Sequence, residues 1–285
     1  MRLCRFDDNR LGLVDGAQVR DVTPALDLLP QLRWPLPPGD LLVANLARLT
    51  PEIARLAPKA PTRPLGALKL LSPVANPTKV IGAPINYKDH IEESKKDQGI
   101  AHGRVIKTIG DWGLFLKANS ALVGPGEGVA LRFLDRRNDH EVELAVIIGR
   151  KGSNISRQAA LDHVAGYAIG LDMTVRGPEL PSFRKSIDTY AVLGPWLVTA
   201  DEIADPDALD FELKLNGATK QKSNTRHLDY DVRRLIEYAS AYYTLYPGDI
   251  IMTGTPAGVG PVQPGDVMQV SMQGIGEMEV KVRAA

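Results

Sequence analysis

The sequence has few of the features that would tie a protein to an oxidising compartment, a membrane or a nucleic acid. Cys4 is its one cysteine, so no internal disulfide can form, and this usage fits a reducing compartment. No apolar run approaches membrane-spanning length, and the first arginines are not followed by the apolar stretch of a signal peptide. Lysine plus arginine number 34, as do aspartate plus glutamate, so no net charge attracts polyanions. We therefore predict a cytoplasmic protein with no membrane and no nucleic-acid partner.

Several common catalytic motifs are also missing from the chain. There is no Gly-x-x-x-x-Gly-Lys-Ser/Thr phosphate loop, no Gly-x-Gly-x-x-Gly between a strand and a helix, and no Gly-x-Ser-x-Gly elbow. The five histidines show no zinc-ligand spacing, and Cys4 has no second cysteine beside it as a ligand. If the protein binds a metal, we therefore expect the ligands to be oxygen atoms.

What the sequence does contain is material for a sizeable core, because 44% of its 285 residues are hydrophobic. Many short strand-like segments are separated by Gly, Pro and Asp turns, and helices are few. This pattern predicts an α+β protein of mostly antiparallel strands, arranged as a sandwich or roll. Two proline-rich stretches predict a small N-terminal α+β domain over residues 1–72 and a larger domain over residues 73–285.

Three local signals predict helices. Apolar residues at helical spacing lie around residues 40–57, with a break expected near Pro51. Ser156 is a plausible N-terminal cap for a helix that follows it. Residues 229–245, "DYDVRRLIEYASAYYTL", form a clear amphipathic pattern.

One strand-like stretch, residues 138–150 with the sequence "NDHEVELAVIIGR", carries two glutamates among core residues. Alternation in a strand puts Glu141 and Glu143 on one face and the intervening Val142 on the other. Two like charges side by side repel, and each resists desolvation. Either they line a solvated face of the strand, or a divalent cation makes them mutually compatible. Asp172, at the end of an apolar stretch, is a candidate third ligand.

Seven segments, in order, resemble the signature segments of the fumarylacetoacetate hydrolase family: "INYKDHIEE", "LFLKANSALVGPGE", "DHEVELAVIIGR", "VAGYAIGLDMTVR", "FRKSIDTYAVLGPWLVT", "LNGATKQKSNT" and "PGDIIMTGTPAGVG". The similarity extends from about Lys79 to Arg283. It implies a β-roll fold, usually homodimeric, that binds Mg²⁺ or Mn²⁺, with Ca²⁺ as an alternative. The ligands implied are the Glu-x-Glu pair and a downstream aspartate, here Glu141, Glu143 and Asp172.

The resemblance also implies roles for other residues. The family's water-activating pair falls at His90 and Glu93, and an i, i+3 pair on one helical turn does share a face. Lys185 matches the active-site lysine. The substrate-binding positions implied are Lys117, Arg176, Gly254 and Thr255. The charged, glycine-containing segment from Ile91 to Gly113 matches a mobile lid, and we expect it to become ordered over substrate.

The activity implied is cleavage of a C–C bond in an acylpyruvate, a small β-diketo acid. His90 and Glu93 would activate water, and the metal and Lys185 would stabilise the enolate that leaves. The same enolate forms on loss of CO₂ or on proton transfer. A decarboxylase, isomerase or hydratase of a 2-oxo dicarboxylate in aromatic or sugar-acid catabolism is therefore the alternative. A noncatalytic metal-bound assembly protein is a third hypothesis, and the intact set of site residues argues against it.

Overall fold

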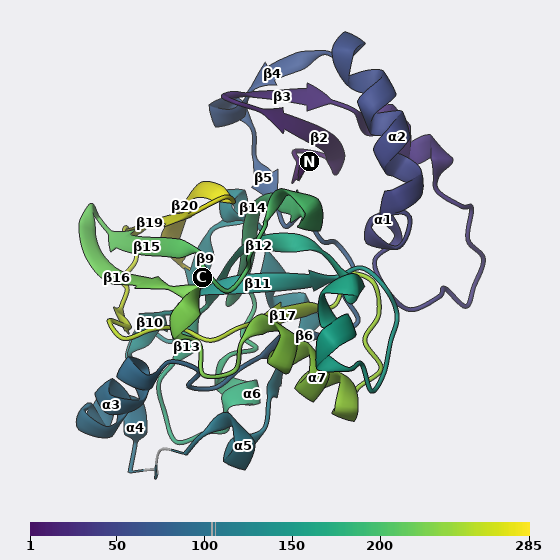
Figure 1. The fold of residues 1–285 in the computed structure, drawn as a ribbon. Coiled ribbons are helices and arrows are strands. Elements are labelled where there is room, and N and C mark those ends of the chain that lie inside the picture. The colour runs from purple at the N-terminus through teal and green to yellow at the C-terminus, as the bar shows by residue number, and fades with distance from the viewer. Residues whose placement is uncertain (104, 106) are drawn as a thin grey trace.

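The computed structural model describes residues 1–103, 105 and 107–285 and is built around one large twisted sheet (Figure 1). Its twelve strands are β1 (Arg2–Phe6), β2 (Arg10–Asp15), β3 (Gln18–Asp21), β4 (Thr62–Pro64), β5 (Leu70–Leu71), β6 (Val80–Gly82), β7 (Phe115–Lys117), β8 (Leu122–Val123), β11 (Val142–Ile148), β12 (Val164–Asp172), β14 (Ala191–Thr199) and β17 (Ile250–Met252). They run in the order β4-β3-β2-β1-β14-β12-β11-β17-β6-β7, with β5 beside β1 and β8 beside β14. Only the β14–β8 and β17–β6 pairs in this sheet of the described chain are parallel.

Two smaller sheets complete the strand structure. One contains β10 (Asn138–His140), β13 (Thr174–Val175) and β18 (Gly260–Pro261), in the order β13-β10-β18. The other contains β9 (Val129–Leu131), β15 (Asp210–Leu215), β16 (Ala218–Asn224), β19 (Val267–Met272) and β20 (Gly276–Ala284), in the order β16-β15-β19-β20-β9. Antiparallel pairs dominate all three sheets, so the predicted α+β, mostly antiparallel fold is confirmed.

The helical segments are short, and the longest of those described have 11 residues. The α-helices are α1 (Leu41–Ala44), α2 (Leu46–Leu56), α3 (Lys88–Lys96), α4 (Gln98–Ala101), α5 (Ile109–Trp112), α6 (Pro181–Arg184) and α7 (Val232–Tyr242). The 3₁₀ helices are η1 (Thr23–Leu28), η2 (Ala57–Lys59), η3 (Leu65–Ala67), η4 (Asn119–Ala121), η5 (Pro125–Glu127), η6 (Arg157–His163), η7 (Ala200–Glu202) and η8 (Thr225–His227). The predicted amphipathic helix is α7, and Ser156 caps η6 by accepting the N–H of Ala159.

The predicted helix break near Pro51 is wrong. The break lies at Asn45, between α1 and α2, and α2 continues through the proline. Pro51 has no N–H to donate to the turn before it. The helix is nevertheless held, because Leu49 and Ile53 on either side of the proline are fully buried in the N-terminal core.

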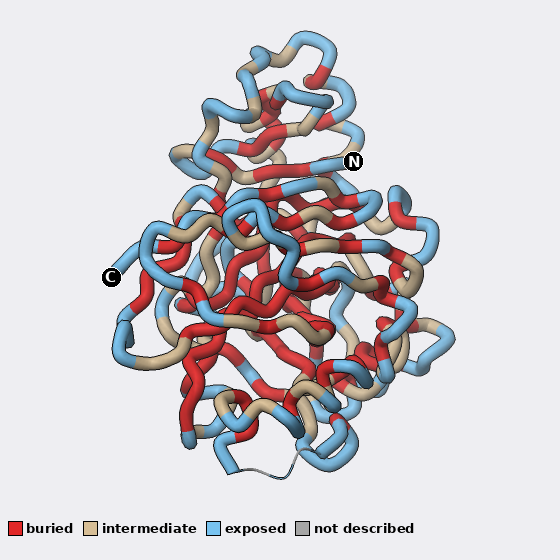
Figure 2. Tube along the Cα trace, turned by 90° about the vertical axis from the view of Figure 1, so that its left-hand side faces the viewer, coloured by how far each residue is buried: buried red, intermediate tan, exposed pale blue. Residues whose placement is uncertain are grey.

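The N-terminal strands and helices have a small core of their own and also extend the main sheet. That core consists of Leu3, Leu11, Val22, Ala25, Leu49, Ile53 and Ala57. β1 pairs antiparallel with β14, where Leu3 lies opposite Leu197. In Figures 1 and 2 this unit stands at one end of the molecule, and α3, α4 and α5 lie at the opposite end.

The central strand β11 is buried on both faces, which explains its nearly continuous apolar sequence. Val142 and Leu144 belong to the larger core cluster on one face, whereas Ala145 and Ile147 belong to a second cluster on the other. Glu143 shares the face of Ala145 and is only 1% exposed. A solvated strand face for the glutamates, one of the two explanations above, is therefore wrong.

The segment predicted to be a lid, residues 91–113, contains most of α3 and all of α4 and α5. Arg104 and Ile106, which belong to this prediction, lie outside the described residues. Its ordering over substrate stays a prediction.

Among the described residues, no helix has both the length and the apolar character needed to cross a membrane.

Candidate metal centre and active site

Three buried carboxylates converge where β11 and β12 lie side by side. Asp172 is the last residue of β12, Glu143 lies on β11, and Glu141 lies in the short gap between β10 and β11. The N–H of Asp172 donates to the carbonyl of Glu141 at 2.9 Å, so these two are cross-strand neighbours. One oxygen of each of the three carboxylates lies within 4.8 Å of the others. Such an all-oxygen set suits Mg²⁺ or Mn²⁺.

Two lysines place positive charge against these acids. Lys185, which follows α6, donates to Glu141 Oε2 at 2.6 Å and to Asp172 Oδ2 at 2.7 Å. It also donates to Thr174 Oγ1 at 2.7 Å. Lys117, the last residue of β7, pairs with Asp172 Oδ1. Burial lowers the pKa of Lys117, although Asp172 opposes this effect. Both predicted lysines therefore belong to the carboxylate cluster.

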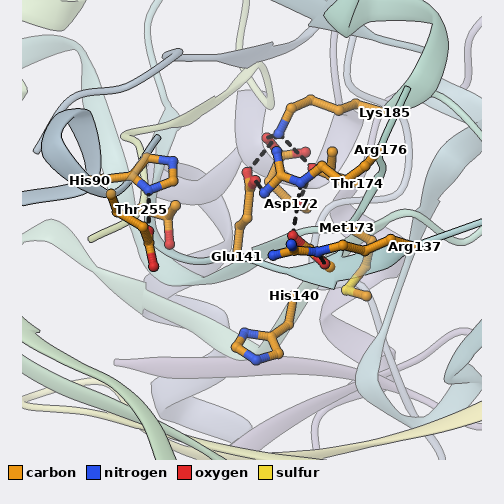
Figure 3. Close-up of polar contacts among 12 residues, drawn as sticks. His90, Arg137, His140, Glu141, Asp172, Met173, Thr174, Arg176, Lys185 and Thr255 are labelled. Carbon is orange, nitrogen blue, oxygen red and sulfur yellow. Dashed lines mark hydrogen bonds and ion pairs between the residues drawn. The ribbon is translucent and has the colours of Figure 1, made fainter. Parts of the chain in front are cut away.

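Glu141 is held as a carboxylate by two cations, which Figure 3 shows converging on it. The Nη2 of Arg176 donates to Glu141 Oε1 at 2.8 Å, opposite the contact made by Lys185. Burial alone would raise the pKa of Glu141, but Lys185 and Arg176 outweigh burial and hold it well below its usual range. Arg176 itself is fixed by a second ion pair at 2.8 Å to the buried Asp139.

An ion-pair chain that the sequence reasoning missed joins this cluster to the lid segment. Arg137 donates through Nε to Asp139 Oδ1 at 2.7 Å and through Nη1 to Asp97 Oδ2 at 2.8 Å. Asp97 also caps α4 by accepting the N–H of Gly99 at 2.8 Å. The start of α4 is therefore tied, through one arginine, to the carboxylate that orients Arg176.

Glu143 has a different environment from Glu141. Its Oε2 accepts the backbone N–H of Gly254 at 2.6 Å. Burial raises the pKa of Glu143 well above its usual range, and the neighbouring Asp172 adds to the effect. Gly254 has a φ of 99°, and a Cβ there would lie 2.6 Å from the Cβ of Asn86, so the position requires glycine. A buried carboxylate with this raised pKa fits a site for a divalent cation held by Glu141, Glu143 and Asp172.

The predicted water-activating pair forms on α3. His90 Nδ1 lies 2.7 Å from Glu93 Oε2, and Glu93 Oε1 accepts the N–H of Gly258 at 2.8 Å. The carboxylate is thus fixed between the imidazole and the glycine-rich loop that follows β17. Glu93 in turn holds the imidazole ring in one orientation. His90 is buried and lines the same cleft as Glu141 and Glu143.

Thr255 lies in the cleft wall, where its hydroxyl is already engaged by the protein. It donates to the carbonyl of Val142 at 2.9 Å and accepts from Gln221 Nε2 at 2.7 Å. Gln221 also contacts His140 Nδ1 at 3.0 Å and is fully buried. The sequence reasoning missed Gln221, because its neighbours in "ATKQKSN" are polar and give no sign of burial. A contact between Thr255 and substrate stays a prediction.

Apolar side chains that line the cleft include Ile100, Ala101 and Trp112 from residues 91–113 and Phe115 from β7. The space left inside is about 50 Å³. That is room for a few water molecules, which occupy roughly 10–15 Å³ each by this kind of measure, and too little for a keto acid. We therefore expect residues 91–113 to move when substrate enters the cleft.

The sheet arrangement and the carboxylate cluster define a class of metal-binding enzyme fold. Residues 79–283 match the family model for the fumarylacetoacetate (FAA) hydrolase C-terminal domain, and the chain belongs to that family. The resemblance inferred from the sequence is thereby confirmed.

Particular relatives narrow the comparison. The chain is 54% identical over 286 residues to the maleylpyruvate hydrolase of Aquipseudomonas alcaligenes, covering 100% of both chains. A crystal structure of maleylpyruvate hydrolase from Sphingobium sp. SYK-6, in complex with manganese(II) and pyruvate, matches with a TM-score of 0.84 and 40% identity, again covering 100% of both. A mitochondrial oxaloacetate tautomerase of Rattus norvegicus is 36% identical over 239 residues, or 80% of this chain and 73% of that protein.

Proposed function

We propose that the protein is a divalent-metal-dependent hydrolase that cleaves maleylpyruvate or a closely similar acylpyruvate. The observation that carries the proposal is the presence of the His90–Glu93 pair in the same cleft as the three carboxylates. Full-length similarity to the maleylpyruvate hydrolase of Aquipseudomonas alcaligenes supports the choice of substrate class. The roles proposed are metal ligands at Glu141, Glu143 and Asp172, proton transfer at His90, charge stabilisation at Lys185, and substrate contacts at Lys117, Arg176, Gly254 and Thr255.

The hydrolytic step begins at His90. With Nδ1 held by Glu93, Nε2 accepts a proton from water while the water oxygen bonds to the distal carbonyl carbon of the substrate. The C–C bond between that carbon and the neighbouring methylene then breaks. Its electron pair passes to the pyruvyl fragment as an enolate, and the proton on His90 is returned to the methylene carbon. The balance is acylpyruvate plus water to carboxylic acid plus pyruvate.

Negative charge develops on the pyruvyl oxygen as the bond breaks. When bound, a divalent ion supplies Lewis-acid charge at the 2-oxo acid end of the substrate. Lys185 adds an ammonium whose direction is fixed by its contacts to Glu141, Asp172 and Thr174. Its Nζ lies 5.2 Å from the centroid of the Phe115 ring. The ring shields the ammonium from water, which lowers the local dielectric constant and strengthens the attraction between the ammonium and the enolate.

The test is product analysis with metal-depleted protein to which Mn²⁺ or Mg²⁺ is restored. Maleylpyruvate, acetylpyruvate and oxaloacetate are each incubated with the protein, and the products are identified by NMR. We expect metal-dependent release of equal amounts of pyruvate and maleate from maleylpyruvate. Conversion of oxaloacetate without hydrolysis of either acylpyruvate would instead favour the decarboxylase or isomerase alternative.

We further propose that the protein is a homodimer. Leu180 and Phe183, in and beside α6, are 76% and 74% exposed, and exposed apolar side chains this close together are typical of a protein–protein contact. Light scattering should give twice the chain mass, and Phe183→Glu should shift the population toward the monomer. A monomeric mass for the unmodified protein at micromolar concentration would contradict the proposal.

Two further predictions concern organisation and location. We propose that the boundary between the N-terminal unit and the family domain lies near residue 72, directly after β5. We also propose a cytoplasmic location, which the single free cysteine, Cys4, supports.

A further inference from the structure

One buried hydroxyl in the wall of the cleft has no protein partner. Ser94 lies on α3, is fully buried, and its Oγ makes no hydrogen bond to any of the described residues. The residue lines the cleft that also contains His90 and Glu143. Because burying a hydroxyl without a partner lowers stability, packing alone gives no reason for serine at this position.

Helix geometry places Ser94 relative to the reacting atoms. His90 and Ser94 are four residues apart on α3, so they share a face and lie about 6 Å apart along the helix axis. His90 must reach the water that attacks the distal carbonyl. In the proposed function the pyruvyl end of the substrate is held on the other side of that carbonyl, near Glu141 and Asp172. With the substrate in that orientation, Ser94 would face the acyl group beyond the attacked carbon.

The same cleft is lined by a buried arginine. Arg184, the last residue of α6, is 7% exposed and lines the cleft together with Ser94, His90 and Lys185. Its Nε donates to the carbonyl of Glu179 at 3.2 Å. A hydroxyl and a guanidinium are both donors that a carboxylate readily accepts. The apolar side chains of Ile100, Ala101 and Trp112, which also line the cleft, suit the hydrocarbon part of an acyl group.

We propose that Ser94, together with Arg184, binds a carboxylate at the far end of the acyl group. The enzyme then selects acylpyruvates whose acyl part is itself a dicarboxylic acid over those that end in a methyl group. This inference rests on the proposed hydrolase function and specifies its substrate class. Ser94 acts on selection among substrates, whereas His90 acts on the cleavage step that all of them share.

The first experiment compares kcat/KM for maleylpyruvate and acetylpyruvate in the unmodified protein and in Ser94→Ala. The variant should lower the ratio of the two values by about 10- to 100-fold, as expected for loss of a hydrogen bond to a charged group, mainly through KM for maleylpyruvate. Glu92→Gln, on the exposed side of the same helix, is the matched control and should leave the ratio unchanged. An unchanged ratio in Ser94→Ala would overturn the inference and leave the hydrolase proposal intact.

The second experiment needs no turnover and so separates the two proposals. Calorimetry measures binding of 2-oxoheptanedioate and of 2-oxoheptanoate to the Mn²⁺-loaded protein; these acids differ only in the far carboxylate. The diacid should bind at least about 10-fold more tightly, and Ser94→Ala and Arg184→Gln should each reduce that preference. Equal binding of the two acids would overturn the inference, whether or not either acylpyruvate is hydrolysed.

A melting curve shows whether Ser94 has a structural role instead. Removing a hydroxyl that has no partner should leave the Tm of Ser94→Ala equal to or above that of the unmodified protein. A lower Tm combined with equal losses for both substrates would identify Ser94 as a packing residue and overturn the inference.

Discussion

Replacing Glu143 with glutamine tests the electrostatic account of the metal centre. The amide keeps the side-chain shape and an oxygen that can accept the N–H of Gly254, now at 2.6 Å, but it removes the charge. In the metal-free protein that charge is unfavourable, because burial and the neighbouring Asp172 raise the pKa of Glu143. With metal bound the same charge is a ligand. Glu143→Gln should therefore stabilise the metal-free protein and abolish its response to metal.

The size of both effects follows from burial and chain length. Removing a charge that burial disfavours is worth about 1–3 kcal/mol, the usual cost of a buried group whose needs are not met. For a chain of 285 residues the entropy of unfolding is about 0.6 kcal/mol per kelvin, so the metal-free variant should melt about 2–5 °C higher. Mn²⁺ at about 100 times its Kd adds about 2.7 kcal/mol to the unmodified protein, or about 4–5 °C. The variant should gain about 1 °C or less, because it has lost one of three anionic ligands.

The assay is differential scanning calorimetry on chelator-treated protein, with and without added MnCl₂. Glu279→Gln, an exposed substitution of the same chemistry on β20, is the control and should behave like the unmodified protein. A full Mn²⁺-dependent shift in Glu143→Gln would remove Glu143 from the ligand set. A lower melting temperature of the metal-free variant would show that neighbouring groups already stabilise the Glu143 charge. The claim that this charge destabilises the metal-free protein would then be wrong.

Three other predictions concern catalysis, the lid and the sheet. His90→Ala should lower kcat/KM for acylpyruvate hydrolysis by about 10²- to 10⁴-fold and decarboxylation of oxaloacetate far less, since the latter needs no activated water; equal losses would contradict this role. Residues 91–113 should be cut more slowly by protease when Mn²⁺ and oxalate are present, and equal cleavage rates would count against a lid. Asp249 is fully buried, accepts the N–H groups of Thr78 and Lys79 at 2.9 Å, and pairs with the Lys79 ammonium at 2.8 Å. Asp249→Ala should cost about 3–5 kcal/mol, seen as a fall in Tm, while the Mn²⁺ response is retained.

Short-range geometry marked the three carboxylates as candidates, and the family resemblance decided between a metal site and a solvated strand face. Alternation along β11 places Glu143 on a definite face, and Asp172 ends the apolar stretch that pairs with it. The His90–Glu93 pair was identified by the family resemblance, and the spacing of one helical turn is compatible with the contact observed. Motif resemblance then supplied the partner residues that local geometry could not identify, such as Lys185.

The residues that sequence reasoning missed act through contacts distant in the chain. Gln221 supports Thr255 from a strand whose polar sequence indicates an exposed edge, and its burial depends on the neighbouring loop after β17. Arg137 contacts Asp139, two residues away in the sequence, and also Asp97, which is 40 residues away. The second contact could not be anticipated from the sequence. The error at Pro51 has the opposite cause, because tertiary packing outweighed a local helix-breaking signal.

The pairing of β1 with β14 protects the main sheet from aggregation through an open strand edge. β14 is the strand next to β12, and all nine of its residues are buried. On its other side β8 covers the end at Ala191, and β1 covers the end at Val198. Without the N-terminal strands, part of a long, hydrophobic strand would offer unpaired backbone groups to other chains, the arrangement from which aggregates grow. With them, the sheet on this side ends instead at β4, which has three residues and finishes in Pro64, a residue that cannot donate to a further strand.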